Sequence, residues 1–206
     1  MSLDYATGHS GCLAVQGIAR MQKRFVTEQE LILNSFRLGA RIYESGFRPT
    51  FIVGLWRGGT SVGISVQECL QTLGVATDHI AVRTSYEGRS GYEEGVRMKR
   101  PINVHGTRHL VDRLEAEDRL LIVDDVYSSG RHSAAVIELL QQRLRFNMPT
   151  DVRVAAPWFR PSGSDGPRPD FCIEETADWL VLPYEISGLT PREIAEHKPF
   201  LLPLLR

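Results

Sequence analysis

One segment near the middle of the chain constrains the fold more than any other. The apolar run Leu120 to Val123 is followed by the acid pair Asp124-Asp125, and then by Ser128-Ser129-Gly130. From Ser133 to Leu144 the apolar residues recur at helical spacing. A continuous apolar run bounded by polar residues is typical of a strand buried on both faces, as in a parallel sheet. The segment therefore predicts a buried strand, a tight polar turn and a helix in immediate succession.

Strand and helix signals alternate on both sides of this segment. Thr27 and Glu30 have the spacing of a capping box, which predicts a helix that begins there and ends at Gly46. Further strands are predicted at 51–55, 79–85 and 152–156, with short ones at 171–173 and 179–182, and further helices at about 60–73 and 191–197. This alternation predicts an α/β fold with a central, mostly parallel sheet flanked by helices. In such folds, ligands bind at the carboxyl ends of the strands.

The turn after the acid pair has the composition of a phosphate site. Ser128, Ser129 and Gly130 allow the backbone to turn tightly, so that free N–H groups at the helix start point at one spot. The helix dipole favours an anion at that place. The two carboxylates at its edge can bind ribose hydroxyls, or a Mg²⁺ that carries phosphates. We therefore expect a sugar-phosphate ligand here.

This segment resembles the motif by which type I phosphoribosyltransferases bind 5-phosphoribosyl-1-pyrophosphate (PRPP). That motif has four apolar residues, two acids, variable positions, and then Thr/Ser-Gly-x-Thr/Ser. The resemblance implies that Asp124 and Asp125 orient ribose and metal. It also implies that the 5-phosphate is held by five consecutive residues: Ser128, Ser129, Gly130, Arg131 and His132.

Two other segments are similar to loops of the same family. Trp56-Arg57-Gly58-Gly59 looks like the pyrophosphate loop, in which Arg57 acts catalytically on the leaving group and a non-proline cis peptide often occurs. Ser85-Tyr86 opens a segment of about 86–106 that looks like the lid that closes over PRPP. The segment is either a source of cations for the ligand or a solvated linker, and its candidate cations are these: Arg89, Arg97, Lys99, Arg100 and His105.

The carboxyl-terminal part is similar to the base-binding hood of the hypoxanthine and xanthine-guanine branch. We call residues 157–190 the hood. By resemblance, Trp179 stacks on a purine, Arg160 reads its 6-oxo group, and Glu185 lies near the base or its metal. The metal set implied is Asp124, Asp125 and Glu185, partly through water, with Mg²⁺ as the cofactor.

Two positions depart from the purine pattern. Ser128 stands where that branch has an aspartate thought to accept the N7 proton, and a serine is no general base near neutral pH without activation. His132 replaces a hydroxyl that contacts the 5-phosphate. A protonated imidazole can donate in its place, or Ser133 can take over with a change of register. These departures bear on which base is accepted and leave PRPP binding as expected.

Three functions are compared on these grounds. The first is a Mg²⁺-dependent phosphoribosyltransferase of purine salvage, acting on a 6-oxopurine or on another base. The second is a regulatory protein of the same fold that binds PRPP or a nucleotide without turnover. The third, a receiver domain, requires its acid pair after the first strand, and the order here is different.

Composition limits the remaining possibilities. With 206 residues we expect one domain, its core at about 27–156. The net charge of -1 argues against a nucleic-acid partner. Three scattered cysteines favour reduced thiols, and we expect a cytoplasmic protein with no membrane span. The family implies a homodimer or homotetramer, and we expect the apolar segment 199–205 to pack on the body or on a second subunit.

Overall fold

The computed structural model describes residues 22–86, 100–161 and 167–205. Within these ranges, seven strands form the main sheet in the order β4-β3-β2-β5-β7-β6, and β8 also pairs with β7. All of these pairs are parallel except β3 with β4. The elements in chain order are β1 (Lys23–Phe25), α1 (Glu28–Glu44), β2 (Phe51–Trp56), α2 (Gly58–Thr72), β3 (Asp78–Tyr86), β4 (Ile102–His105), α4 (Arg108–Arg113), β5 (Arg119–Val123), β6 (Val126–Tyr127), α5 (Arg131–Leu144), β7 (Asp151–Phe159), β8 (Phe171–Glu175), β9 (Trp179–Val181) and α6 (Pro191–His197).

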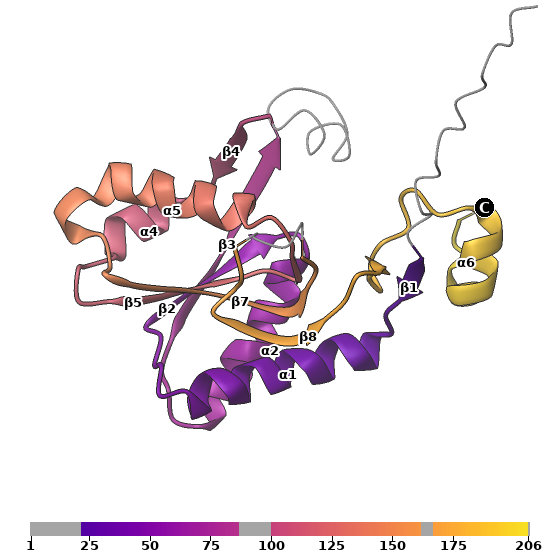
Figure 1. Cartoon of the computed structure of the whole chain (residues 1–206), viewed down its shortest axis with the longest axis horizontal. Helices are drawn as coiled ribbons and strands as arrows, with labels where there is room; N and C mark the ends of the chain where they lie inside the picture. The colour runs from indigo at the N-terminus through magenta and orange to yellow at the C-terminus, as the bar shows by residue number, and fades with distance from the viewer. Residues whose placement is uncertain (1–21, 87–99, 162–166, 206) are drawn as a thin grey trace, which may run out of the picture.

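Helices cover both faces of this sheet, as the strand-helix alternation predicts. Helices α1 and α2 lie over one face, and α4 and α5 lie over the other (Figure 1). Strand β5 supplies both layers: Leu121 and Val123 pack in the core on the α1 and α2 side, and Leu120 and Ile122 pack on the α5 side. All four are fully buried. Side chains that alternate between two apolar layers explain the continuous apolar run.

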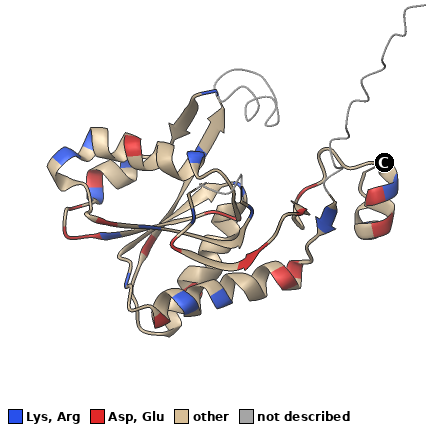
Figure 2. Ribbon diagram, viewed as in Figure 1, with Lys and Arg blue, Asp and Glu red and all other residues tan. Residues whose placement is uncertain are grey.

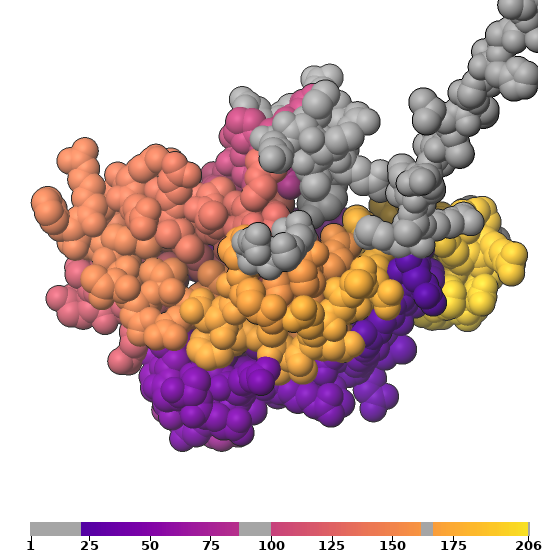
Figure 3. Space-filling model, in the orientation of Figure 1, coloured from indigo at the N-terminus to yellow at the C-terminus, as the bar shows by residue number. Residues whose placement is uncertain are grey.

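A small second sheet lies at one end of the molecule. Strand β1 pairs in parallel with β9, so that Lys23 is opposite Trp179. Helix α6 packs on β1, where the rings of Phe25 and His197 stack with centroids 3.7 Å apart and Lys23 Nζ lies 2.8 Å from Glu193 Oε1. The space-filling view shows these segments in contact, indigo against yellow (Figure 3). The weak periodicity of residues 1–24 predicts no structure, yet Lys23 and Arg24 belong to β1, which pairs with the hood.

Several sequence expectations need correction. The glycines and mixed charges of the lid segment 86–106 predict no regular structure, but Ile102–His105 forms β4 and pairs antiparallel with β3. Residues 87–99 lie outside the described part, and with them Arg89, Arg97 and Lys99. Within the hood range, β8 pairs with β7 of the main sheet, and β9 pairs with β1. Helix α4 and strand β6 were not predicted; both are short, with 6 and 2 residues.

The carboxyl-terminal apolar segment does not bury its side chains on the body. Phe200 is 59% exposed and Leu204 75% exposed. Packing against a second subunit stays a prediction. Basic and acidic side chains are interspersed along the helices (Figure 2), as the near-zero net charge suggests. No helix within the described ranges has the length and apolar character needed to span a bilayer.

Candidate active site

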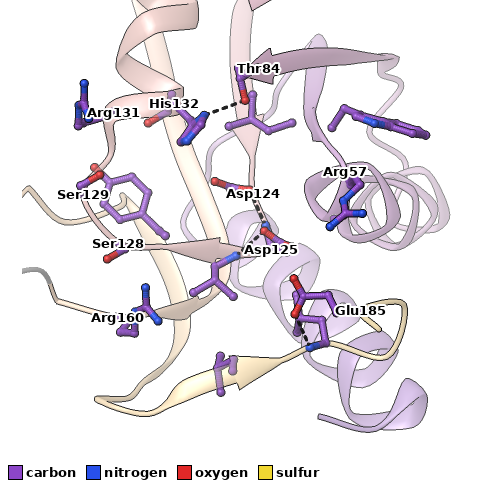
Figure 4. Close-up of a pocket in the computed structure, with 18 of the residues that line it drawn as sticks. Arg57, Thr84, Asp124, Asp125, Ser128, Ser129, Arg131, His132, Arg160 and Glu185 are labelled. Carbon is purple, nitrogen blue, oxygen red and sulfur yellow. Dashed lines mark hydrogen bonds between the residues drawn. The ribbon is translucent and has the colours of Figure 1, made fainter. Parts of the chain in front are cut away.

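A cavity of about 720 Å³ opens at the carboxyl ends of the parallel strands. It is lined by the ends of β2, β3 and β5, by the start of α5 and by the segment around β9 (Figure 4). Most of the residues selected from the sequence line it, namely Trp56, Arg57, Gly58, Ser85, Asp124, Asp125, Ser128, Ser129, Gly130, Arg131, His132, Arg160, Trp179 and Glu185. Gly59 and Tyr86 are not among the lining residues, although both adjoin one. The structure therefore brings together segments that are more than 100 residues apart.

The acid pair directly follows β5 and lines this cavity. The Asp125 N–H donates to Asp124 Oδ1 at 2.9 Å, and the Val126 N–H donates to Asp125 Oδ1 at 2.9 Å. Burial raises the pKa of Asp124 well above its usual range, and the neighbouring Asp125 carboxyl adds to the rise. Two carboxyls so close together favour a shared proton or a bound cation.

The turn before α5 forms a cradle for an anion. Gly130 has φ +68°, and a Cβ there would lie 2.2 Å from Tyr127 Oη, so the position requires glycine. Gly130 is also the N-cap of α5 and provides no side-chain cap. The first N–H groups of this 14-residue helix therefore have no side-chain acceptor from the N-cap residue. They lie at the end of the helix that lines the cavity. This arrangement suits a phosphate.

His132 is placed differently from both alternatives that the sequence left open. Its Nδ1 lies 2.8 Å from Thr84 Oγ1, and its ring meets the Tyr86 ring edge-on at 5.2 Å. Burial lowers the pKa of His132, and Arg131 lowers it further, so the neutral imidazole is favoured over a protonated donor. Ser133 Oγ donates to the Gly130 carbonyl at 2.9 Å, which directs its proton away from the cavity.

Thr84 is a lining residue that the sequence reasoning missed. Its hydroxyl comes from β3 and lies beside His132, the residue that replaces the hydroxyl expected in the resemblance motif (Figure 4). The resemblance motif could not reveal it, because Thr84 lies 48 residues away in the chain. The β-branched pattern of 79–85 showed only that a strand passes there.

The loop after β2 approaches the acid pair closely. The Trp56–Arg57 peptide is cis, as the resemblance implies. A Cβ on Gly59 would lie 2.3 Å from the Val123 carbonyl oxygen, so backbone packs directly against backbone at this point. The Arg57 side chain points into the same cavity (Figure 4). Its charge lowers the pKa of Glu185, although burial, the larger effect, raises that pKa overall.

The aromatic and basic residues of the hood meet at the other side of the cavity. The guanidinium carbon of Arg160 lies 4.5 Å from the centroid of the Trp179 ring. Both line the cavity that also holds Asp124 and Asp125. The Arg160 N–H donates to the Tyr127 carbonyl at 2.8 Å, which ties this residue to the phosphate loop. A flat ring with a planar cation beside it suits a planar, polar ligand.

Glu185 stands apart from this pair. Its Oε2 accepts a hydrogen bond from the Leu182 N–H at 3.0 Å, and the Arg57 guanidinium lies close enough to act on its charge. No three His, Cys, Asp or Glu side chains of the described residues converge on one point as a metal site. Carboxylate oxygens are nevertheless the ligands that Mg²⁺ prefers. Burial raises the pKa values of both Asp124 and Glu185, and the charge of Asp125 raises both further. The carboxyl groups of Asp124, Asp125 and Glu185 are therefore the side chains in this cavity that could hold a cation.

At the lid side, Ser85 and Tyr86 end β3. The Arg131 guanidinium lies 5.6 Å from the Tyr86 ring centroid, and Arg131 donates to the Arg100 carbonyl at 2.6 Å. The start of α5 is thereby joined to the segment that returns from the lid. His105 belongs to β4 and does not line the cavity.

Comparison with protein-family models and with curated proteins finds no match. Among solved structures, a purine phosphoribosyltransferase from Pyrococcus horikoshii Ot3 is similar at 19% identity and a TM-score of 0.62, covering 82% of this chain and 98% of that one. A hypothetical protein from Neisseria gonorrhoeae with bound ppGpp is similar at 17% identity and 0.65, covering 87% and 95%. The xanthine-guanine-hypoxanthine phosphoribosyltransferase of Helicobacter pylori is similar at 12% identity and 0.58, covering 80% and 95%. The chain therefore has the α/β fold of type I phosphoribosyltransferases.

Proposed function

We propose that this protein is a phosphoribosyltransferase that transfers the 5-phosphoribosyl group of PRPP to a nucleobase and releases pyrophosphate. The preferred acceptor is a 6-oxopurine. One observation carries the proposal: the acid pair, the uncapped start of α5, the Arg57 loop and the Arg160–Trp179 pair all line one cavity. A cavity of about 720 Å³ has the size of a small-molecule site.

The sugar phosphate would lie across the acid pair. The amides of Ser129 to His132 would hold the 5-phosphate, because the helix start offers N–H donors and a favourable dipole. Thr84, Ser128 and Ser129 offer hydroxyls in the same cavity lining. Asp124 and Asp125 would accept hydrogen bonds from the ribose hydroxyls, which fixes the sugar relative to the reacting carbon.

Transfer requires the C1–oxygen bond to pyrophosphate to break while the C1–nitrogen bond forms. Positive charge then grows on the sugar and negative charge on the leaving group. Arg57 and the amides of Gly58 and Gly59 would stabilise the pyrophosphate, since a guanidinium and close amides interact most strongly with the developing anion. The acid pair would stabilise the positive sugar electrostatically.

Mg²⁺ is proposed as the cofactor, held by Asp124 and Asp125 together with ligand phosphates. Glu185 would contribute through water. When bound, the ion supplies charge neutralisation to the pyrophosphate. The raised pKa of Asp124 supports the assignment, because carboxyls that repel one another in the free protein gain from a shared cation.

The base would stack on Trp179, with Arg160 donating to its 6-oxo group. In the free protein Arg160 lies over the Trp179 ring, so this guanidinium must slide toward the ring edge to admit a base. The Arg160 backbone stays fixed by its bond to Tyr127. Ser128 offers no carboxylate to accept a proton from the base, so the proton would leave to water or to the pyrophosphate.

A second function is favoured by the same departure. A regulatory protein that binds PRPP or a purine nucleotide needs no proton acceptor, and Ser128 and neutral His132 suit binding alone. The similar protein from Neisseria gonorrhoeae was solved with ppGpp bound. This reading predicts saturable ligand binding without pyrophosphate release.

One assay separates the two functions. The protein is incubated with PRPP and Mg²⁺, and hypoxanthine, guanine, xanthine, adenine, orotate and uracil are offered in turn while pyrophosphate is measured. Release with a 6-oxopurine supports the enzyme and identifies the base. Binding of PRPP with no release on any base refutes it. The expected homodimer or homotetramer and the expected cytoplasmic location are proposals that sedimentation and cell fractionation test separately.

A further inference from the structure

The turn after β9 reaches from the hood to the acid pair. Tyr184 Oη donates to Asp125 Oδ2 at 2.6 Å, and the other oxygen of that carboxylate accepts the Val126 N–H at 2.9 Å. Both oxygens of Asp125 are therefore held, one by main chain and one by a side chain 59 residues away. A carboxylate fixed in this way presents its remaining lone pairs in one direction only.

The start of α2 is shaped around this hydrogen bond. A Cβ on Gly58 would lie 1.8 Å from Tyr184 Oη and 1.9 Å from Asp125 Oδ2. Gly58 has an unexceptional backbone, and its conformation would permit other residues. The absence of a side chain is thus explained by the contact itself, because any larger residue would separate the hydroxyl from the carboxylate.

A buried lysine, Lys198, holds the turn that carries Tyr184 by hydrogen bonds to its main chain. Lys198 follows α6 and is only 4% exposed. Its Nζ donates to the Leu182 carbonyl at 3.0 Å and to the Pro183 carbonyl at 2.7 Å. Burial of an ammonium is costly unless its protons are bonded, so the two carbonyls and the lysine fix one another. The two residues that Lys198 holds directly precede Tyr184.

We propose that Tyr184 is a positioning residue for Asp125, and that Lys198 is a positioning residue for Tyr184. The chain beyond the hood would in this way set the orientation of the carboxylate that binds the sugar. The inference rests on the proposed function, since it takes PRPP as the ligand of Asp125. It assigns to Tyr184 and Lys198 no contact with the reacting atoms.

The order of action makes a specific thermodynamic prediction. If Tyr184 acts through Asp125, removing its hydroxyl has no further effect once Asp125 no longer carries a charge. If Lys198 acts through Tyr184, its replacement has little further effect once the hydroxyl is gone. Residues that stabilise the fold independently would instead show additive effects.

The experiment is a double-mutant cycle read by calorimetric titration of PRPP with Mg²⁺. The variants are Tyr184→Phe, Lys198→Met, Asp125→Asn and the pairs of Tyr184→Phe with each of the other two. Tyr43→Phe and Lys23→Met are matched controls, since neither residue lines the cavity and Lys23 also contacts the α6 segment. Lys198→Gln replaces Lys198→Met if the latter does not fold. Thermal unfolding is followed for every variant.

We expect Tyr184→Phe to weaken PRPP binding about tenfold, in line with one hydrogen bond to a charged group, while unfolding stays close to wild type. In the Asp125→Asn background the same change should alter affinity less than twofold. Lys198→Met should weaken binding severalfold, and less than twofold in the Tyr184→Phe background. The controls should bind as the wild type does.

Two results would overturn the inference alone. One is a Tyr184→Phe protein that binds PRPP within twofold of wild type, and the other is a Tyr184→Phe effect that is equally large without the Asp125 charge. An effect of Lys198→Met that persists in full without the Tyr184 hydroxyl would remove Lys198 from the scheme. A wild-type protein that does not bind PRPP at all would instead overturn the proposed function, which keeps the two failures distinct.

Discussion

Two adjacent glycines at the start of α2 offer a paired test of the site, because the same added methyl group meets different atoms at each. At Gly59 an added Cβ lies 2.3 Å from the Val123 carbonyl oxygen and 2.9 Å from Asp124 Cα. Real Cβ atoms essentially never approach closer than 3.0 Å, and both colliding atoms are backbone. The Gly59→Ala protein must therefore separate α2 from the end of β5.

The cost of that separation can be estimated. Overpacking of a well-packed interior costs about 1–3 kcal/mol, and a collision between two backbone segments belongs at the upper end of that range. We therefore expect Gly59→Ala to lower the free energy of unfolding by about 3 kcal/mol. For a chain of this length the melting temperature should fall by roughly 6–12 °C.

At Gly58 the added Cβ meets side-chain ends instead, the Tyr184 hydroxyl and the Asp125 carboxylate. These groups can rotate away, and alanine is a better helix former than glycine by about 1 kcal/mol. The free energy of unfolding of Gly58→Ala should thus stay within about 1 kcal/mol of wild type. Its PRPP affinity should fall at least about tenfold, because the Tyr184–Asp125 hydrogen bond is broken.

Chemical denaturation and calorimetric titration of PRPP, run on both variants, check the pair. The reasoning requires opposite profiles: stability lost at Gly59, and affinity lost with stability retained at Gly58. If Gly59→Ala unfolds at the wild-type denaturant concentration, the backbone contact is wrong. If Gly58→Ala binds PRPP normally, the cavity does not use Asp125 as described.

Further outcomes follow from the same site. Asp124→Asn should raise thermal stability at pH 7, because burial raises the pKa of Asp124 and so disfavours its charged form in the folded chain. Below pH 3.8 the carboxyl is mostly uncharged whether the chain is folded or not, so the substitution should leave thermal stability unchanged there. Melting curves at pH 7 and at a pH below 3.8 check both expectations. Replacing both Asp124 and Asp125 by Asn should abolish measurable PRPP binding by calorimetry. Trp179→Ala should raise the KM for the base at least tenfold with little change in the KM for PRPP, as initial rates would report. Wild-type stability should fall as pH drops below about 6.5, because burial lowers the pKa of both His79 and His132 and the unfolded chain then takes up protons that the folded chain does not. Urea unfolding at a series of falling pH values measures this loss of stability, and the loss should be smaller in His132→Asn.

The local parts of the site were predictable from the sequence because neighbouring residues build them. Residues 120–144 contain a strand, its acid pair, a glycine turn and a helix, and each of these has its own signal in composition or spacing. The first turn of α5 begins at Arg131, two residues before the predicted start, because Gly130 rather than Ser133 ends the turn. The cis peptide at Trp56–Arg57 was accessible only through the resemblance, since no composition rule predicts it.

The parts that sequence could not predict depend on contacts between distant segments. Strand β1 has three residues and weak periodicity, and it exists because β9 pairs with it 156 residues later. Strand β4 was hidden among glycines and charges because its partner, β3, supplies its hydrogen bonds. Thr84 likewise gains its place only when β3 and α5 meet.

The same distinction bears on how the charge of the site is organised. A net charge of -1 says little about an anionic ligand when the cations are placed locally. Arg57 and the α5 amides come from local motifs, and their positions follow from the strands that precede them. Arg160 and Asp125 are oriented by distant partners, Trp179 for the first and Tyr184 for the second. Phosphate binding should therefore tolerate changes in the hood, whereas base selection and sugar orientation should not. Inorganic phosphate that protects Tyr184→Phe and wild-type protein equally against thermal unfolding would support this division, and unequal protection would contradict it.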